Sequence, residues 1–174
     1  MKKLKKIIVA VDGSAVSMKA FEWAANLTSI FEAKLVVVSV SDKRSIKDDE
    51  LYPAFLTDSK LNEIVEAFSE KHEGILKGIQ NKSREMGISV TAVVLHGLPS
   101  EEIVKLAGNE DADLIVMGAH GKRKEFYREF SSTSERVLKK ASCPVLKIVP
   151  ERPFKKEEGK KPSQKPYQPI LYST

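Results

Sequence analysis

Short apolar runs alternate with segments of helical periodicity, and this alternation constrains the fold of the chain more than any other feature. The runs occupy residues 6–12, 35–40, 90–97, 113–118 and 144–149. Short β-branched runs that stop at turn residues are typical of strands buried on both faces. Because parallel neighbouring strands need a crossover helix between them, the order predicts βαβ units and a doubly wound α/β domain.

The segments between the runs repeat apolar residues with the period of a helix. The first such set is Phe21, Ala24, Ala25, Thr28 and Phe31. The second is Leu61, Ile64, Val65, Phe68, Ile75, Leu76 and Ile79. We expect this second helix to end near Gly87, and His72 on its apolar face to be a packing residue, since no second metal-binding residue stands at a useful spacing. Ser100 is the predicted N-cap of the next helix.

The length of 174 residues favours one domain, which we place at residues 1–150. Residues 41–55 lose periodicity and predict a surface connection. Residues 151–174 are rich in Pro, Lys and Glu, and we expect a basic, flexible tail that does not extend the core. Its last apolar residues could dock onto a groove or a partner; they are Tyr167, Ile170, Leu171 and Tyr172.

Charge and composition narrow the functional classes. The formal net charge is +5, and much of the excess lies in the first six residues and the tail. Without a recognised binding motif or an aromatic basic face, we do not expect nucleic-acid binding. No apolar run approaches the roughly 20 residues of a membrane span, and IIVAV is shorter than the roughly 7 to 15 residues of a signal-peptide core. We therefore expect a cytoplasmic protein, and the single cysteine, Cys143, agrees with a reducing compartment.

Residues 117–137 predict an anion site at the carboxyl end of the fourth run. Gly118 and Gly121 allow close approach of a ligand to the backbone. Ser132 and Glu135 have the spacing of a capping box, so Ser132 is the predicted N-cap of the last helix. Free amides at a helix N-terminus favour phosphate, and the loop adds the cations Lys122, Arg123, Lys124 and Arg128. An ordinary capped helix after a surface loop is the alternative.

Asp12 ends the first apolar run and should lie at the same edge of the sheet. A carboxylate there can accept hydrogen bonds from ribose hydroxyls. The alternative is that Asp12 caps the turn or helix that follows, as an aspartate in Asp-Gly-Ser often does.

The order of these residues resembles the universal stress protein family. The resemblance rests on Asp12 after a first strand, then Gly118-Ala119-His120-Gly121, nine residues, Ser131-Ser132 and the continuation SERVLKKASCPVLKIV. The family pattern is G-x-x-G, nine residues, G-[ST], and the match covers about residues 4–150. It implies a single α/β domain with a five-stranded parallel sheet in the order 3-2-1-4-5, helices on both faces, of the adenine nucleotide alpha hydrolase-like (HUP-type) class.

The resemblance also implies a ligand, an adenine nucleotide that is usually ATP, with or without Mg²⁺. By position, Asp12 would contact ribose or adenine, Val40 would flank adenine, and Met117 with Gly118 would lie near the ribose. The phosphates would be lined by Gly121, Ser131, Ser132 and Thr133. Ser131 stands where the family has a third glycine, so its side chain could crowd the phosphate or donate a hydroxyl hydrogen bond to it.

The last apolar run predicts pairing with a second protein chain. It begins with Pro144 and ends with Val149, and a final apolar strand lies at an edge of the sheet where it can pair with another chain. In the family this strand commonly forms a homodimer. Lys147 at its centre is otherwise an ordinary charge that protects the edge.

Three functions remain open at this stage. The first is an ATP-binding regulator that signals to an unknown protein partner. The second is a nucleotide-free dimeric interaction module, suggested by Ser131 and the basic tail. The third is a slow ATPase, but no P-loop is present, and His96 and His120 lack a recognisable carboxylate partner, so we assign no catalytic or metal-binding residue.

Overall fold

The computed structural model describes residues 3–42, 58–119 and 133–149 of the chain. The strands are β1 (Lys6–Ala10), β2 (Lys34–Ser41), β3 (Val90–His96), β4 (Leu114–Gly118) and β5 (Val145–Ile148). The helices are α1 (Ala15–Phe31), α3 (Asp58–Glu85), α4 (Pro99–Asn109) and α5 (Thr133–Lys140). The predicted tail and most of the predicted surface connection lie outside the described residues.

All five strands form one parallel sheet in the order β3-β2-β1-β4-β5, which confirms the predicted topology. The central strand is β1, where Ile8 pairs with Val36 of β2 on one side and with Ile115 of β4 on the other. The chain winds outward from β1 to β3 and then returns to β4. The winding therefore reverses between β1 and β4, where open parallel sheets commonly bind ligands.

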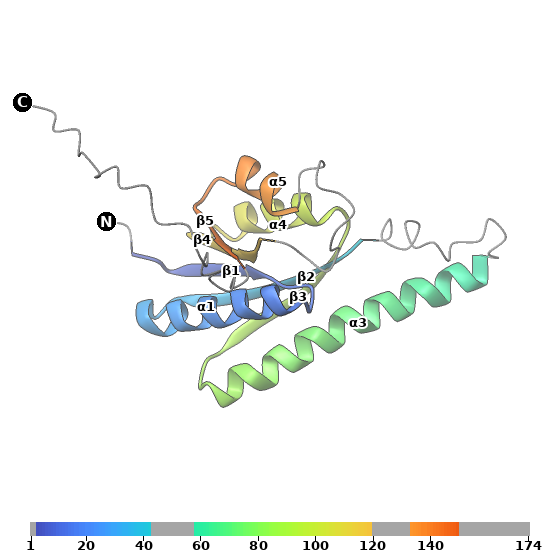
Figure 1. Cartoon of the computed structure of the whole chain (residues 1–174), viewed down its shortest axis with the longest axis horizontal. Helices are drawn as coiled ribbons and strands as arrows, with labels where there is room; N and C mark the ends of the chain where they lie inside the picture. The colour runs from blue at the N-terminus through green and yellow to red at the C-terminus, as the bar shows by residue number, and fades with distance from the viewer. Residues whose placement is uncertain (1–2, 43–57, 120–132, 150–174) are drawn as a thin grey trace, which may run out of the picture.

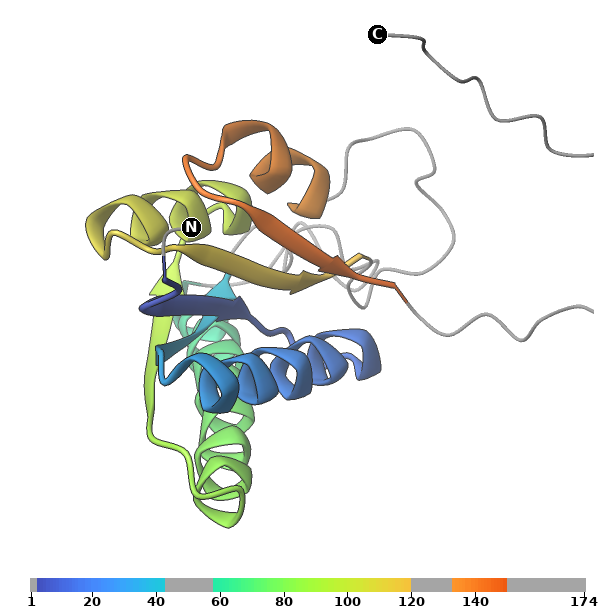
Figure 2. The same cartoon turned by 90° about the vertical axis from the view of Figure 1, so that its left-hand side faces the viewer.

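Helices cover both faces of the sheet, α1 and α3 on one and α4 and α5 on the other (Figures 1 and 2). Successive residues of β1 point to opposite faces, so Ile7 and Val9 pack under α1 and α3, whereas Ile8 packs under α4 and α5. All three are fully buried. A strand covered on both faces needs apolar residues at every position, which explains the continuous runs in the sequence.

The helix boundaries confirm one predicted signal and correct another. Gly87 has φ 69° and follows α3, where Ile88 N donates to Ser83 O at 3.0 Å and closes the helix end as predicted. The predicted N-cap Ser100 is wrong, because α4 begins at Pro99 with Leu98 in the cap position and Ser100 is buried in the first turn. Proline at the first helical position has its φ already set for a helix, so the helix starts earlier than the serine suggests.

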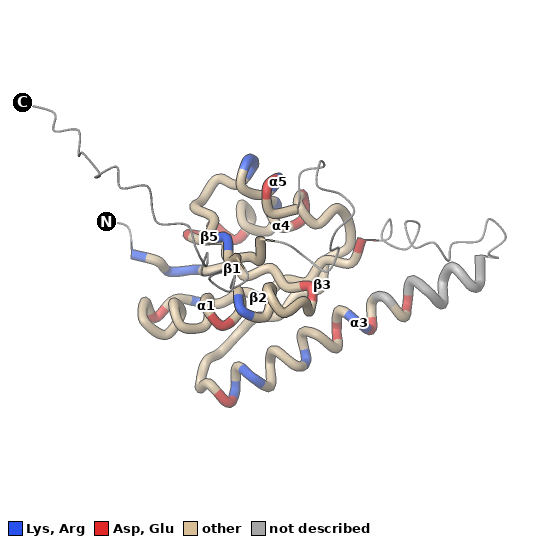
Figure 3. Tube along the Cα trace, in the orientation of Figure 1, with Lys and Arg blue, Asp and Glu red and all other residues tan. Residues whose placement is uncertain are grey.

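Most charged residues of the described ranges lie on the helices and near the ends of the strands, whereas Lys147 stands within β5 (Figure 3). Acidic and basic residues both occur along the coloured part of α3 (Figure 3). Among the described helices, none combines the length and the hydrophobicity that crossing a lipid bilayer requires.

Candidate functional site

The predicted site residues with described positions lie at the carboxyl ends of β1, β2 and β4. Asp12 follows β1, Val40 lies near the end of β2, and Met117 and Gly118 end β4. The register brings these ends together, because Ala10 is paired with Val38 on one side and with Met117 on the other. Three strands that are separate in the sequence thus present their predicted site residues at one edge.

Asp12 begins the turn that starts α1. Its Oδ1 accepts a hydrogen bond from Ser14 N at 2.9 Å, and Gly13 between them adopts φ 75°. Ser14 is the N-cap of α1, and its Oγ accepts from Ser17 N at 3.2 Å. The capping role of Asp12 is confirmed, and it holds the carboxylate beside the N-terminus of α1, where the helix dipole favours negative charge.

The peptide group between Val11 and Asp12 is held by two serines. Ser39 Oγ donates to Val11 O at 2.8 Å, and Asp12 N donates to Ser17 Oγ at 3.2 Å. His72 Nδ1 lies 2.7 Å from Ser39 Oγ, so this histidine on α3 is hydrogen bonded as well as packed. Sequence reasoning missed Ser39. The available signal was a serine inside the otherwise apolar run LVVVSV, where a buried hydroxyl needs a partner.

Gly118 allows β4 to approach the first turn of α1. A Cβ at this position would lie 3.0 Å from Val16 Cγ1 and 3.3 Å from Ser17 N. Gly118 therefore lets β4 pack closely against α1, and the close approach of a ligand that the sequence predicts at this glycine stays a prediction. Met117 is buried and Val40 half-buried, and both pack in the apolar cluster under α4 and α5.

The N-terminus of α5 is fixed against the end of β4. Ser134 Oγ donates to Ala119 O at 3.0 Å, and Lys147 Nζ of β5 pairs with Glu135 Oε1 in the first turn. Thr133 is the first residue of α5 and is exposed. Several residues predicted for the site or its loop lie outside the described ranges. They are Gly121, Ser131, Ser132, His120 and the four loop cations, Lys122, Arg123, Lys124 and Arg128.

Two other candidate residues are described, His96 at the same carboxyl edge and Cys143 just before β5. His96 is exposed at the end of β3. Cys143 is partly buried against the cluster under α4 and α5, as expected of a packing residue. Within the described ranges, no group of three or more His, Cys, Asp or Glu side chains could hold a metal ion.

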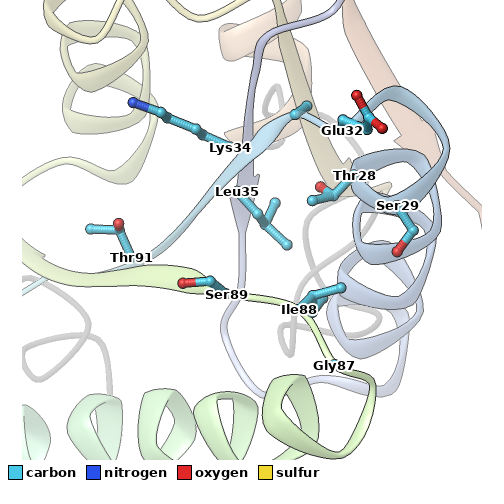
Figure 4. A pocket seen from close by; sticks show the side chains of 10 residues that line it. Thr28, Ser29, Glu32, Lys34, Leu35, Gly87, Ile88, Ser89 and Thr91 are labelled. Atoms are coloured by element: carbon cyan, nitrogen blue, oxygen red, sulfur yellow. The ribbon is translucent and has the colours of Figure 1, made fainter.

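A hollow of about 580 Å³ lies at the opposite, amino edge of the sheet (Figure 4). It is bordered by the end of α1, the start of β2 and the turn from α3 to β3, and its lining includes Thr28, Glu32 and Lys34. Thr28 Oγ1 is buried without a hydrogen-bond partner among the described atoms. None of the lining residues belongs to the predicted site, so the hollow is a separate feature.

The parallel sheet and the reversal of its winding define a doubly wound α/β protein. Its candidate site lies at the carboxyl edge, where Asp12 and Gly118 are found. The chain belongs to the universal stress protein family, whose profile matches residues 3–148. Universal stress protein MJ0531 of Methanocaldococcus jannaschii is 35% identical over 144 residues, which cover 83% of this chain and 81% of that protein. Universal stress protein MJ0577 of the same organism is 30% identical over 152 residues, covering 83% of this chain and 94% of that protein.

Solved structures agree with this assignment. The structure of MJ0577 superposes with a TM-score of 0.72 at 28% identity and covers 87% of this chain and all of that one. Two structures that share the fold at 20% identity are described with ligands. One is a universal stress protein in complex with cAMP (TM-score 0.63, 84% of this chain and 98% of that one). The other is a family protein from Arabidopsis thaliana with AMP bound (TM-score 0.60, 84% and 92%).

Proposed function

We propose that the protein binds an adenine nucleotide, ATP in the first instance, at the carboxyl edge of the sheet as a regulatory ligand. The observation that carries the proposal is the placement of Asp12. Its carboxylate is held in the turn between β1 and α1, at the same edge of the sheet as the end of β4, where the winding of the sheet reverses. A carboxylate in this position can accept hydrogen bonds from the ribose hydroxyls of a nucleotide.

The surrounding residues fit the remaining parts of a nucleotide. Half-buried Val40 offers apolar contact to a base, and the end of β4 at Met117 and Gly118 offers backbone groups near a ribose. Thr133 begins α5, whose N-terminus favours phosphate. We assign the other phosphate contacts to Gly121, Ser131 and Ser132 from the family pattern.

The comparisons support an adenine nucleotide as the class of ligand. Two proteins of the same fold are described with AMP and with cAMP, so the fold accommodates an adenosine phosphate in those proteins. ATP with Mg²⁺ is the specific proposal for this chain. ATP hydrolysis would need a positioned water and groups that stabilise the charge on the transferred phosphate. His96 is exposed at the end of the edge strand β3, and we assign it no catalytic role.

We further propose that the protein acts as a cytoplasmic homodimer formed through residues 144–149. The strand β5 ends the sheet, and its residues Val145 to Ile148 are all half-buried in the single chain. An apolar edge strand pairs readily with a second copy of itself. Nucleotide occupancy would then be reported to a downstream protein partner.

Mass spectrometry of ligand released from freshly purified protein, followed by ATP titration calorimetry with and without Mg²⁺, tests the proposal. Asp12→Ala should weaken ATP binding about tenfold or more, because it removes a charged acceptor. Asp12→Asn keeps an acceptor for Ser14 N while removing the charge, and therefore separates ligand binding from the capping of α1. Gly121→Val should also weaken binding, whereas Ser29→Ala at the far end of α1 should not.

Two results would overturn the proposal. The absence of bound ligand and of titratable ATP, confirmed by equilibrium dialysis, would favour a nucleotide-free interaction module. Unchanged ATP affinity in both Asp12→Ala and Gly121→Val would move the binding site elsewhere. Accumulation of ADP in proportion to protein, lost in Gly121→Val, would instead indicate slow ATP hydrolysis.

A further inference from the structure

A chain of hydrogen bonds runs from α3 through the interior to Asp12. His72 Nδ1 lies 2.7 Å from Ser39 Oγ, and Ser39 Oγ donates to Val11 O at 2.8 Å. Val11 O belongs to the same peptide group as the amide of Asp12, which donates to Ser17 Oγ at 3.2 Å. The peptide group that precedes Asp12 is therefore held at its oxygen from β2 and at its nitrogen from α1.

The direction of each hydrogen bond follows from the number of protons. A serine hydroxyl carries one proton, and Ser39 donates it to Val11 O. The proton between Ser39 and His72 must therefore sit on His72 Nδ1, which makes His72 the donor. This donation occupies a lone pair of Ser39 Oγ and fixes the rotation of the hydroxyl so that its proton points at Val11 O.

Burial makes this arrangement costly to disturb. Ser39 is completely buried and Ser17 is 4% exposed, so solvent does not compete for either hydroxyl. A hydrogen bond in such surroundings is electrostatically stronger than in water, and an unsatisfied buried hydroxyl is penalised. Losing the donor at His72 therefore disturbs Ser39, and through Ser39 the peptide group it holds.

His72 also connects Asp12 to a long helix. It continues the buried stripe of α3 formed by Leu76, Ile79 and Ser83, one turn beyond Leu76. Towards its N-terminus α3 extends well past the end of β2 (Figure 1). His72 thus joins α3 to the sheet near the edge that carries Asp12.

We propose that His72 is a positioning residue for the nucleotide site, acting on Asp12 through Ser39 and the Val11–Asp12 peptide group. Rotation of this peptide group moves the Cα–Cβ bond of Asp12 and with it the carboxylate. Nucleotide affinity then depends on His72 although His72 does not contact the nucleotide. The inference rests on the proposed function of Asp12.

ATP titration calorimetry of the full-length protein tests this link. His72→Leu removes the donor and should weaken ATP binding about 3- to 10-fold, the effect of one buried hydrogen bond. His72→Asn places an amide N–H where Nδ1–H stood and should bind within about twofold of the wild type. Ser39→Ala should weaken binding at least as much as His72→Leu. Because both side chains act along one path, the double variant should bind like Ser39→Ala alone.

Ile79→Val is the matched control for packing. It removes a methylene from the same stripe of α3 without touching Ser39, so it should lower the free energy of unfolding and leave ATP affinity unchanged. If Ile79→Val weakened ATP binding as much as His72→Leu, or if Asn failed to rescue position 72, the effect would be one of packing and the inference would be overturned.

Nitrogen-15 NMR of the nucleotide-free protein separates failure of this inference from failure of the proposed function. The amide signal of Asp12 should shift in His72→Leu and stay in place in Ile79→Val. If His72→Leu bound ATP as tightly as the wild type and its Asp12 amide signal did not move, only the positioning role of His72 would be wrong. If the wild type bound no nucleotide, the proposed function and this role would fall together.

Discussion

Two aspartates, one at each edge of the sheet, both accept hydrogen bonds from backbone amides but differ in their surroundings. At the amino edge, Asp113 Oδ2 accepts from Lys5 N at 2.8 Å and Lys6 N at 3.1 Å, and the side chain is 9% exposed. At the carboxyl edge, Asp12 Oδ1 accepts from Ser14 N at 2.9 Å and remains half-buried beside a glycine turn. The first carboxylate ties the entry of β1 to β4. The second begins the turn into α1 and is the carboxylate to which we assign nucleotide binding.

The direction of the helices explains the difference. In a parallel sheet every crossover helix starts at the carboxyl edge, as α1, α4 and α5 do here at Ala15, Pro99 and Thr133. Their N-termini bring free amides and the positive ends of their dipoles to that edge. The amino edge receives helix C-termini instead, among them the end of α1 beside the hollow at Thr28. Anionic ligands are therefore favoured at the edge that carries Asp12.

The largest expected effect is on stability and comes from the amino edge. Asp113→Ala leaves the amides of Lys5 and Lys6 without their carboxylate acceptor and should lower the free energy of unfolding by about 2–4 kcal/mol. Urea denaturation measures this change, and ATP affinity should be unaffected. Asp113→Asn, which keeps a carbonyl oxygen, should lose less. A loss below about 1 kcal/mol for Asp113→Ala would mean that this edge does not depend on the carboxylate.

A smaller loss of unfolding free energy is expected from adding a side chain at Gly118, where β4 packs against α1. Gly118→Ala places a Cβ 3.0 Å from Val16 Cγ1 and should cost about 1–3 kcal/mol of unfolding free energy by overpacking. The double variant with Val16→Ala should recover part of the loss, since Ser17 N at 3.3 Å still remains. Gly74→Ala on α3, which meets nothing within 4 Å, should instead stabilise the protein slightly. Equal effects at Gly118 and Gly74 would contradict the packing role of Gly118.

The smallest expected effect compares two buried hydroxyls. Thr28→Val removes a hydroxyl that has no partner among the described atoms, so the free energy of unfolding should change by less than about 0.5 kcal/mol. Ser39→Ala removes a hydroxyl bonded to Val11 O and His72 and should cost about 1–3 kcal/mol. Thermal denaturation of both variants measures the contrast. A comparable loss at Thr28 would show that its hydroxyl is satisfied within the hollow.

Sequence reasoning predicted the elements of the fold well and the polar contacts poorly. The strands are continuous apolar runs because both faces are covered, and Gly87 ended α3 because a positive φ favours glycine there. The strand order followed from the family resemblance. Ser100 was misplaced because Pro99 starts the helix sooner than a serine signal suggests.

The candidate site was predictable to the extent that it follows the strand ends. Asp12 and Gly118 could be placed at one edge because parallel strands align their carboxyl ends. Ser39 and His72 stand 33 positions apart, and a pair so distant in the sequence leaves no local pattern. Their contact depends on how α3 crosses β2.

The sequence by itself determined which segments form strands, where their turns lie and which carboxylate follows β1, because these depend on local periodicity and on turn residues. Only the tertiary structure decided that Gly118 faces α1 and that His72 reaches the Asp12 peptide group through Ser39. Side-chain hydrogen bonds between distant elements require an orientation and a distance that only the packing of helices on the sheet can fix.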